Sequence, residues 1–190
     1  MAKRPIYLAL VHYPVLNRHG ELIASAITNL DIHDIARLAR TYDLSAYYLV
    51  TPLTDQQSLA RRLIDHWLKG AGGDINADRR EAMRLIRVAG DIEEVCRQIT
   101  LETGRPVLVY VTTAKKRADS INWSCLRKRI EDQGRNGILL LFGTASGFES
   151  SVFENADGVI SPIEGDREYN HLPVRSAAAI TLDRLLGDIN

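Results

Sequence analysis

The fold of this chain of 190 residues is decided by the sequence GILLLFGTASGFESSVFENADGVISPI at residues 137–163 and by YNHLPVRSAAAITLDRLL at residues 169–186. Residues 138–142 form a continuous apolar run, which is typical of a strand buried on both faces of a parallel sheet. Gly143 and Gly147 follow that run, and glycine allows a backbone to approach a small molecule closely. A second short strand and then a helix are predicted in the same region. Two buried strands therefore each lead into a loop suited to hold a ligand.

Similar apolar, β-branched or tyrosine-rich runs alternate with helical patterns along the rest of the chain. The predicted strands are residues 6–11, 46–50, 107–111, 138–142 and 159–160, with a brief one at 88–89. A first helix is predicted to be capped by Asn29 or Asp31, and the later helices are residues 55–69, 76–87, 91–103, 123–133 and 174–186. This alternation predicts an α/β fold, a mostly parallel sheet flanked by helices. The length fits a single domain over residues 1–190.

The composition gives few hints of a partner. Lysine plus arginine equal aspartate plus glutamate, at 24 each, so no global basic charge indicates a nucleic acid, although local basic patches remain available. Cys96 and Cys125 lie in helical patterns without CxxC spacing, which argues against a disulfide framework or a zinc site. A reducing cytoplasm is therefore expected. Residues 6–11 are interpreted as a first strand rather than a signal segment, and no run reaches membrane-spanning length.

The positions of the glycines argue against the common nucleotide-binding folds. A dinucleotide-binding fold places GxGxxG directly after its first strand, and that motif is absent here. No Walker lysine follows a glycine-rich loop either. The glycines that look functional come late in the chain, after the fourth main strand.

The last quarter of the chain resembles the SPOUT superfamily, the trefoil-knotted RNA methyltransferases that use S-adenosylmethionine (AdoMet), and within it the bacterial RNA methyltransferase-like group. The likeness is carried by a glycine-loop strand, a short helix, an Ala-Asp pair, a strand ending in proline and an alanine-rich helix, at residues 140–147, 150–155, 156–157, 160–162 and 171–180. It implies a C-terminal trefoil knot, AdoMet as cofactor, no metal, a homodimer, and RNA, either tRNA or rRNA, as substrate.

The resemblance also implies that cofactor contacts come from three loops at strand ends. Backbone amides and carbonyls can read an adenine edge without a dedicated charged side chain. A bulky side chain in place of Gly143 or Gly147 is expected to fill the volume of the cofactor and leave the fold intact. The expected cofactor-binding residues are Thr112, Thr113, Phe142, Gly143, Thr144, Gly147, Ile160, Ser161, Asn170, His171 and Leu172.

Two residues are candidates for catalysis by the same resemblance. In the ribose-methylating branch, an arginine on the first helix stands about six residues before the glycine that precedes the second strand, and Arg37 stands six before Asp43. A bidentate cation there suits orientation of a substrate phosphate or easier deprotonation of the nucleophile. The alternative is a surface ion pair between Asp34 and Arg37. His171 is the second candidate, as a proton acceptor or a ligand contact, with Asp166 as another proton acceptor.

The chain departs from the ribose-methylating pattern in ways that leave its target open. The glutamate of the glycine motif is missing from residues 143–147, and the serine and asparagine of the last motif are replaced around His171 and Pro173. The methylated atom is therefore either a ribose oxygen or a base nitrogen. An AdoMet-binding module without catalysis, in a regulatory or adaptor role, is the alternative function. Basic residues at 115–117 directly follow the third main strand, where a phosphate contact would bring RNA near the methyl donor.

Overall fold

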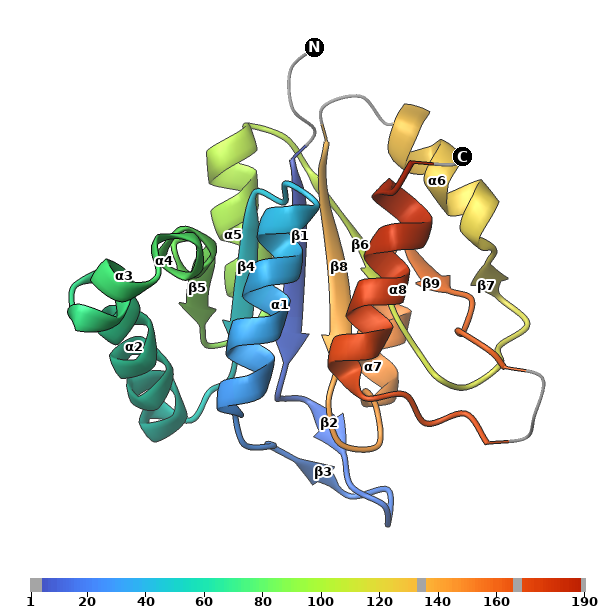
Figure 1. Cartoon of the computed structure of the whole chain (residues 1–190). Helices are drawn as coiled ribbons and strands as arrows, with labels where there is room; N and C mark the ends of the chain where they lie inside the picture. Colours follow the sequence, from blue (N-terminus) through green and yellow to red (C-terminus); the bar gives the residue numbers. More distant parts are fainter. Residues whose placement is uncertain (1–4, 133–135, 166–168, 189–190) are drawn as a thin grey trace.

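The computed structural model describes residues 5–132, 136–165 and 169–188. Figure 1 shows a single large sheet with helices on both of its faces. Its seven strands lie in the order β5-β4-β1-β8-β6-β9-β7, and each neighbouring pair is parallel. They are β1 (Ile6–Val11), β4 (Ala46–Val50), β5 (Ile86–Ala89), β6 (Val107–Val111), β7 (Ser120–Ile121), β8 (Gly137–Gly143) and β9 (Gly158–Ile160). The predicted parallel α/β sheet is confirmed. Threading of the C-terminal segment into a knot stays a prediction.

Helices cover the two faces of the sheet unequally. One apolar cluster joins the sheet to α1, α2, α4, α6 and α8, and the other joins it to α5 and α7. The helices are α1 (Asn29–Thr41), α2 (Thr54–Leu68), α3 (Ala71–Ile75), α4 (Ala77–Met83), α5 (Ile92–Thr103), α6 (Trp123–Asp132), α7 (Ser150–Glu154) and α8 (Val174–Leu186). Among the described helices, none is both long and apolar enough to cross a bilayer.

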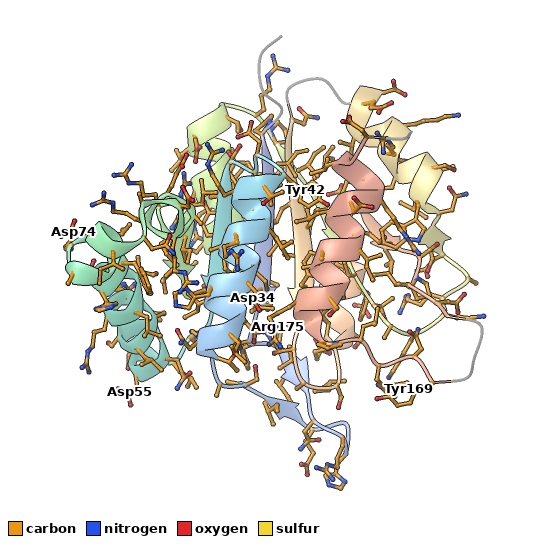
Figure 2. All side chains as sticks on the ribbon, viewed as in Figure 1. Asp34, Tyr42, Asp55, Asp74, Tyr169 and Arg175 are labelled. Carbon is orange, nitrogen blue, oxygen red and sulfur yellow. The ribbon has the colours of Figure 1, made fainter. Side chains whose placement is uncertain are left out.

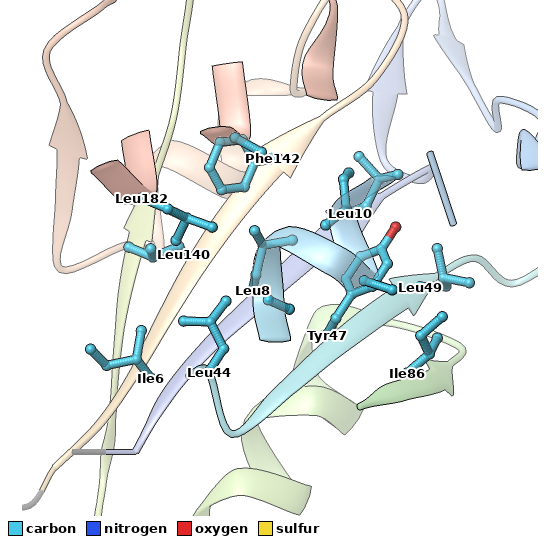
Figure 3. Packing of buried hydrophobic residues seen from close by; sticks show 14 of the residues in the cluster. Ile6, Leu8, Leu10, Leu44, Tyr47, Leu49, Ile86, Leu140, Phe142 and Leu182 are labelled. Atoms are coloured by element: carbon cyan, nitrogen blue, oxygen red, sulfur yellow. The ribbon is translucent and has the colours of Figure 1, made fainter. Parts of the chain in front are cut away.

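The central strands are apolar at every position because both of their faces are covered. Successive side chains of a strand point to opposite faces. Leu8 and Leu10 accordingly belong to the larger cluster, whereas Tyr7 and Ala9 belong to the smaller one. Figure 3 shows Leu8 and Leu10 packed with side chains of neighbouring strands and helices in the larger cluster. Each buried leucine contributes about 1.5–3 kcal/mol of transfer free energy, so these runs fix the fold.

The ends of the helices follow local capping chemistry. Asp91 caps α5 by accepting from the backbone N of Glu94. The predicted cap of α1 was wrong, because Thr28 holds that position. Its Oγ1 accepts from the backbone N of Asp31 at 3.2 Å and donates to Asp31 Oδ2 at 2.6 Å. The two side chains thereby satisfy each other at the start of the helix. α2 ends at Leu68, just before Gly70, and Gly72 and Gly73 lie in the short α3.

Three short strands were not predicted. β2 (Val15–Leu16) and β3 (Leu22–Ile23) form a separate antiparallel hairpin, and β7 extends the edge of the large sheet. Each has two residues, too few for an alternating pattern to appear in the sequence. The hairpin lies below the sheet in Figure 1, next to the loop that follows β8.

Candidate cofactor site at the carboxyl edge of the sheet

The predicted cofactor loops leave the sheet from adjacent strands. β6 lies between β8 and β9, and Val111 is in register with both Leu141 and Val159. Because all three strands are parallel, the loops after them emerge at one edge, at the bottom of Figure 1. Open parallel sheets bind ligands outside the carboxyl ends of their strands. All of the predicted cofactor-binding residues are therefore brought to the same edge of the fold.

Hydrogen bonds tie these loops to the sheet and to one another. Thr112 donates to the carbonyl oxygen of Leu141 twice, from its backbone N at 3.0 Å and its Oγ1 at 2.8 Å. Asn170 Nδ2 donates to the carbonyl oxygen of Ala114 at 3.1 Å, which joins the last loop to the first. The backbone N of Ser161 donates to the carbonyl oxygen of Ile121 at 2.9 Å. The loop backbones are thus fixed by contacts within the chain.

The predicted contact residues differ in what they offer to a ligand. Phe142 and Ile160 are each 1% exposed, with side chains packed in the larger apolar cluster. They offer a ligand only backbone groups. His171 and Leu172 are exposed, and the His171 ring lies 5.3 Å from the ring of Tyr169 between centroids. Figure 2 shows Tyr169 at the rim of this edge, well away from α1.

The two glycines of the β8 loop are required for reasons internal to the chain. A Cβ at Gly143 would lie 3.1 Å from ring atoms of Phe148, tighter than ordinary contact. Gly147 has a φ of +104°, a backbone angle that residues other than glycine rarely adopt. A Cβ at Gly147 would meet no other atom within 4 Å, so the constraint there is the backbone angle and not space. That substitutions at both positions leave the fold intact stays a prediction, but their effect is not limited to the volume of a ligand. A bulky residue at either position disturbs the loop itself.

A partly buried hydrogen-bond chain that was not predicted holds Thr144 of the same loop. Thr144 Oγ1 lies 3.2 Å from the carbonyl oxygen of Val11 and 2.5 Å from Ser25 Oγ, which lies 2.8 Å from His12 Nδ1. A carbonyl oxygen can only accept, so the Thr144 hydroxyl donates to it and accepts from Ser25. Ser25 in turn accepts from His12, which assigns the His12 proton to Nδ1.

The environment of His12 keeps its imidazole neutral. The residue is fully buried, and Nε2 has no hydrogen-bond partner among the described residues. Burial lowers the pKa of His12 to about 4, although the carboxylate of Asp31 acts to raise it. A neutral donor at Nδ1 therefore anchors the loop through Ser25. The sequence signal that could have revealed it is a histidine directly after the first buried strand, at the carboxyl edge.

The β2–β3 hairpin forms backbone hydrogen bonds with the same loop. Leu16 donates to the carbonyl oxygen of Gly147 and accepts from Ser146, both at 2.8 Å. Val15 also forms an isolated antiparallel bridge with Phe148. The hairpin thus holds the glycine loop through backbone contacts.

The structure places Arg37 away from the loops of its own chain. The predicted alternative, an Asp34–Arg37 pair, is not formed, because Asp34 Oδ2 lies 3.2 Å from Arg175 Nε on α8. Arg37 is exposed, makes no ion pair with any described residue, and lines a hollow of about 400 Å³ between α1 and α8. No contact among the described residues joins it to His171. Asp166 lies outside the described residues.

Comparison with known proteins defines the class of this fold and site. Residues 5–187 match the family model described as SAM-dependent RNA methyltransferase, SAM being AdoMet, and the chain belongs to that family. It is similar to the SpoU methyltransferase AviRb from Streptomyces viridochromogenes, whose structure contains AdoMet, with a TM-score of 0.58 and 14% identity over 98% of this chain and 58% of that one. Such low identity shows the fold alone. The predicted family of AdoMet-dependent RNA methyltransferases is confirmed, and the fold is that of a SpoU methyltransferase.

Two relatives differ in the share of their own length that this chain covers. It is 43% identical to a tRNA (guanine-N(1)-)-methyltransferase of Oleidesulfovibrio alaskensis, over 97% of this chain but 43% of the relative. It is 37% identical to an uncharacterized protein of Aquifex aeolicus, over 97% of this chain and 90% of that protein. The chain thus spans less than half of the first relative and nearly all of the second.

Proposed function

We propose that this protein transfers a methyl group from AdoMet to tRNA or rRNA. The observation that carries the proposal is the convergence of three loops, one of them rich in glycine, at the carboxyl edge of β6, β8 and β9 in a member of the SAM-dependent RNA methyltransferase family. Backbone groups dominate this edge, which fits a ligand that is recognised by its adenine and ribose. When bound, AdoMet supplies an electrophilic methyl group on a positively charged sulfur.

The chain's own residues would hold the cofactor and orient it. We assign adenine recognition to backbone groups of the loops that begin at Phe142 and Ile160, because those two side chains are committed to the core. Thr144 is positioned by the partly buried His12–Ser25 chain. Asn170 keeps the last loop against the first. His171, exposed beside these loops, is our candidate to contact the ligand or accept the proton released by the nucleophile.

Arg37 is our candidate for activating the substrate, and we propose that it acts across a homodimer. Its side chain has no competing ion pair with the described residues, and it lines the hollows that α1 forms with α8 and with α4 rather than the loops of its own chain. Leu30 at the start of α1 is 61% exposed, and Leu172 just before α8 is 44% exposed. These apolar side chains, together with the small Ser176 and Ala179 in the hollow, suit a second copy. Arg37 would then orient a substrate phosphate at the partner's cofactor loops.

The methylated atom is proposed only as a class, a base nitrogen or a ribose oxygen. Guanine N1, named for the relative from O. alaskensis, is one such base nitrogen. That name belongs to a protein of which this chain matches 43%, so the activity is not assigned to the matched part. The alternative function, an AdoMet-binding module without catalysis, is not favoured by membership of a family described as methyltransferases.

Cofactor choice is the first test of this function. Titration calorimetry with AdoMet, with its demethylated product and with NAD should give binding for the first two ligands only. NAD binding without AdoMet binding would remove the proposed function. Binding of AdoMet by a protein that labels no RNA would leave the binding-module alternative.

A further inference from the structure

A second hollow, of about 280 Å³, lies between α1 and α4, on the side of α1 that faces away from α8 (Figure 1). Arg37 and Arg79 both line it, together with Arg40, Thr41, Asn76, Asp78 and Ala82. We call it the α1–α4 hollow. It contains none of the residues expected to bind the cofactor.

Arg79 is held in this hollow by packing and not by an ion pair. Its guanidinium carbon lies 4.9 Å from the centroid of the Trp67 ring, a cation–π distance. Trp67 is itself held edge to face against His33, with 5.3 Å between the ring centroids. The Nε atom of Arg79 is buried without a hydrogen-bond partner, and the side chain forms no ion pair, among the described residues. A fixed guanidinium therefore has unused hydrogen-bond donors.

The other cations near the hollow are already neutralised. Arg40 contacts Glu81 at 2.6 Å and Asp43 at 3.5 Å, and Arg80 contacts Asp74 at 3.2 Å. Arg37 and Arg79 differ from them, because neither has an acidic partner within the part of the chain that the structure describes. Two unpaired guanidinium groups beside one hollow repel each other unless an anion lies between them. Asp78 is the one carboxylate among the described residues that line the hollow, so it offsets only part of that charge.

The remaining lining groups suit the oxygens of a phosphate. Asn76 uses its Oδ1 to accept from the backbone N of Arg79 at 2.9 Å, which leaves its Nδ2 available as a donor. Thr41 adds a hydroxyl. One guanidinium can donate two parallel hydrogen bonds to two oxygens of a phosphate, and its positive charge matches the charge of the phosphate. The volume accommodates one phosphate group and several waters of about 30 Å³ each.

We propose that the α1–α4 hollow binds a backbone phosphate of the RNA substrate through Arg37 and Arg79. This inference rests on the proposed function and adds a binding residue, Arg79, to it. Arg37 lies six residues after Asp31 on α1, about 9 Å along the helix axis from the carboxyl edge at 1.5 Å per residue. The phosphate bound there flanks the methylated nucleotide and sets the position of the RNA across α1.

The test compares two neighbouring arginines of α4. Arg79→Met removes the charge and keeps an apolar side chain on Trp67, whereas Arg80→Met removes an arginine that is already paired with Asp74. RNA affinity is measured by fluorescence anisotropy between 50 and 200 mM salt (roughly the range over which phosphate contacts weaken). Arg79→Met should weaken binding on the order of tenfold and lower the salt slope by about 0.7–0.9, the value for one lost phosphate contact. Arg80→Met should match the parent protein, and AdoMet affinity should be unchanged in both.

A variant that gains affinity guards against loss of folding. Asp78→Asn removes the carboxylate that lines the hollow, and it should tighten RNA binding severalfold. Equal RNA affinity in the parent, Arg79→Met and Asp78→Asn proteins would overturn the inference and leave the proposed function standing. A parent protein that binds neither AdoMet nor RNA would overturn both.

Two further outcomes identify other occupants of the hollow. If millimolar inorganic phosphate raises the melting temperature of the parent but not of Arg79→Met, while their RNA affinities agree, the ligand is a free anion and the RNA assignment is wrong. If Arg79→Met converts a dimer to a monomer in sedimentation, an acidic surface of the second copy fills the hollow, which also overturns the inference.

Discussion

Arg175 Nη1 on α8 lies 3.0 Å from Oδ1 of Asp31, a residue of α1 that is only 6% exposed. The same guanidinium reaches Asp34 through Nε, so one side chain at the start of α8 joins two carboxylates of α1. Figure 2 shows Arg175 and Asp34 between these two helices. This contact fixes the beginning of α8, which directly follows the last cofactor loop. Because Arg175 pairs with Asp34, that carboxylate is not paired with Arg37, which lies one turn away on the same helix.

Loss of Arg175 should destabilise the fold more than loss of an exposed arginine. Arg175→Ala leaves the nearly buried Asp31 carboxylate without its cation, which should lower the free energy of unfolding by about 2–3 kcal/mol, given the partial exposure of the arginine. Arg40→Ala breaks only pairs that are about half exposed and should cost less than about 1 kcal/mol. Urea denaturation measures both. Equal decreases in the free energy of unfolding in the two variants would show that the Arg175 contact stabilises the fold no more than an exposed ion pair does.

Arg37→Ala should separate cofactor binding from chemistry. AdoMet affinity depends on loops that Arg37 does not touch, so calorimetry should show a change of no more than a few-fold. Single-turnover methylation should fall on the order of a hundredfold, the scale for loss of one oriented charge-stabilising contact. Arg40→Ala, one turn further along α1, is the control and should retain the rate. Unchanged methylation by the Arg37 variant would contradict its assigned role.

Ser25→Ala should weaken cofactor binding from a position outside the glycine loop. The substitution leaves His12 Nδ1 and Thr144 Oγ1 without the hydroxyl that connects them, and an unsatisfied buried polar group costs about 1–3 kcal/mol. If the chain positions Thr144 for AdoMet, calorimetry should show affinity lower by about tenfold. Ser25→Thr keeps the hydroxyl and should restore most of it. A Ser25→Ala protein with parental affinity would show that the chain serves stability alone.

Acid should destabilise the protein through His12. Its pKa is about 4 in the fold, below the ordinary value of 6.5, so the unfolded chain binds more protons between those two values. The stabilisation is therefore complete above pH 6.5 (roughly the unfolded pKa) and is lost as pH falls toward 4, by about 3 kcal/mol in total. His12→Asn should flatten the dependence measured by urea denaturation.

The matched control for this pH dependence is a second histidine. Burial lowers the pKa of His33 as well, with Arg79 and His66 acting in the same direction and Asp34 opposing. A His33→Asn variant should therefore keep the part of the dependence that belongs to His12. An unchanged dependence in His12→Asn would contradict the assignment of a buried neutral imidazole.

The sequence predicts the parts of this fold that are long and uniformly buried. The central strands, most helices and the convergence of three loops follow from apolar runs and glycine positions. The partly buried chain of His12, Ser25 and Thr144 joins residues 13 and 119 positions apart, and such pairings depend on tertiary packing rather than local pattern. The same holds for Arg175, which displaced the expected partner of Asp34 from 141 positions away in the sequence. The types of residue in the sequence indicate the chemistry of the site. The contacts between those residues can be read only from the folded structure.

The central claim is tested most directly by methyl transfer itself. The purified protein is incubated with AdoMet carrying a labelled methyl group and with separated tRNA and rRNA from a strain that lacks the gene, and label in each RNA is measured in a single turnover. Label should enter one of these RNA classes, in proportion to enzyme, and should enter neither class when both come from the parent strain, whose sites are already methylated. Binding of AdoMet without label in any RNA, at enzyme in excess over RNA, would contradict it.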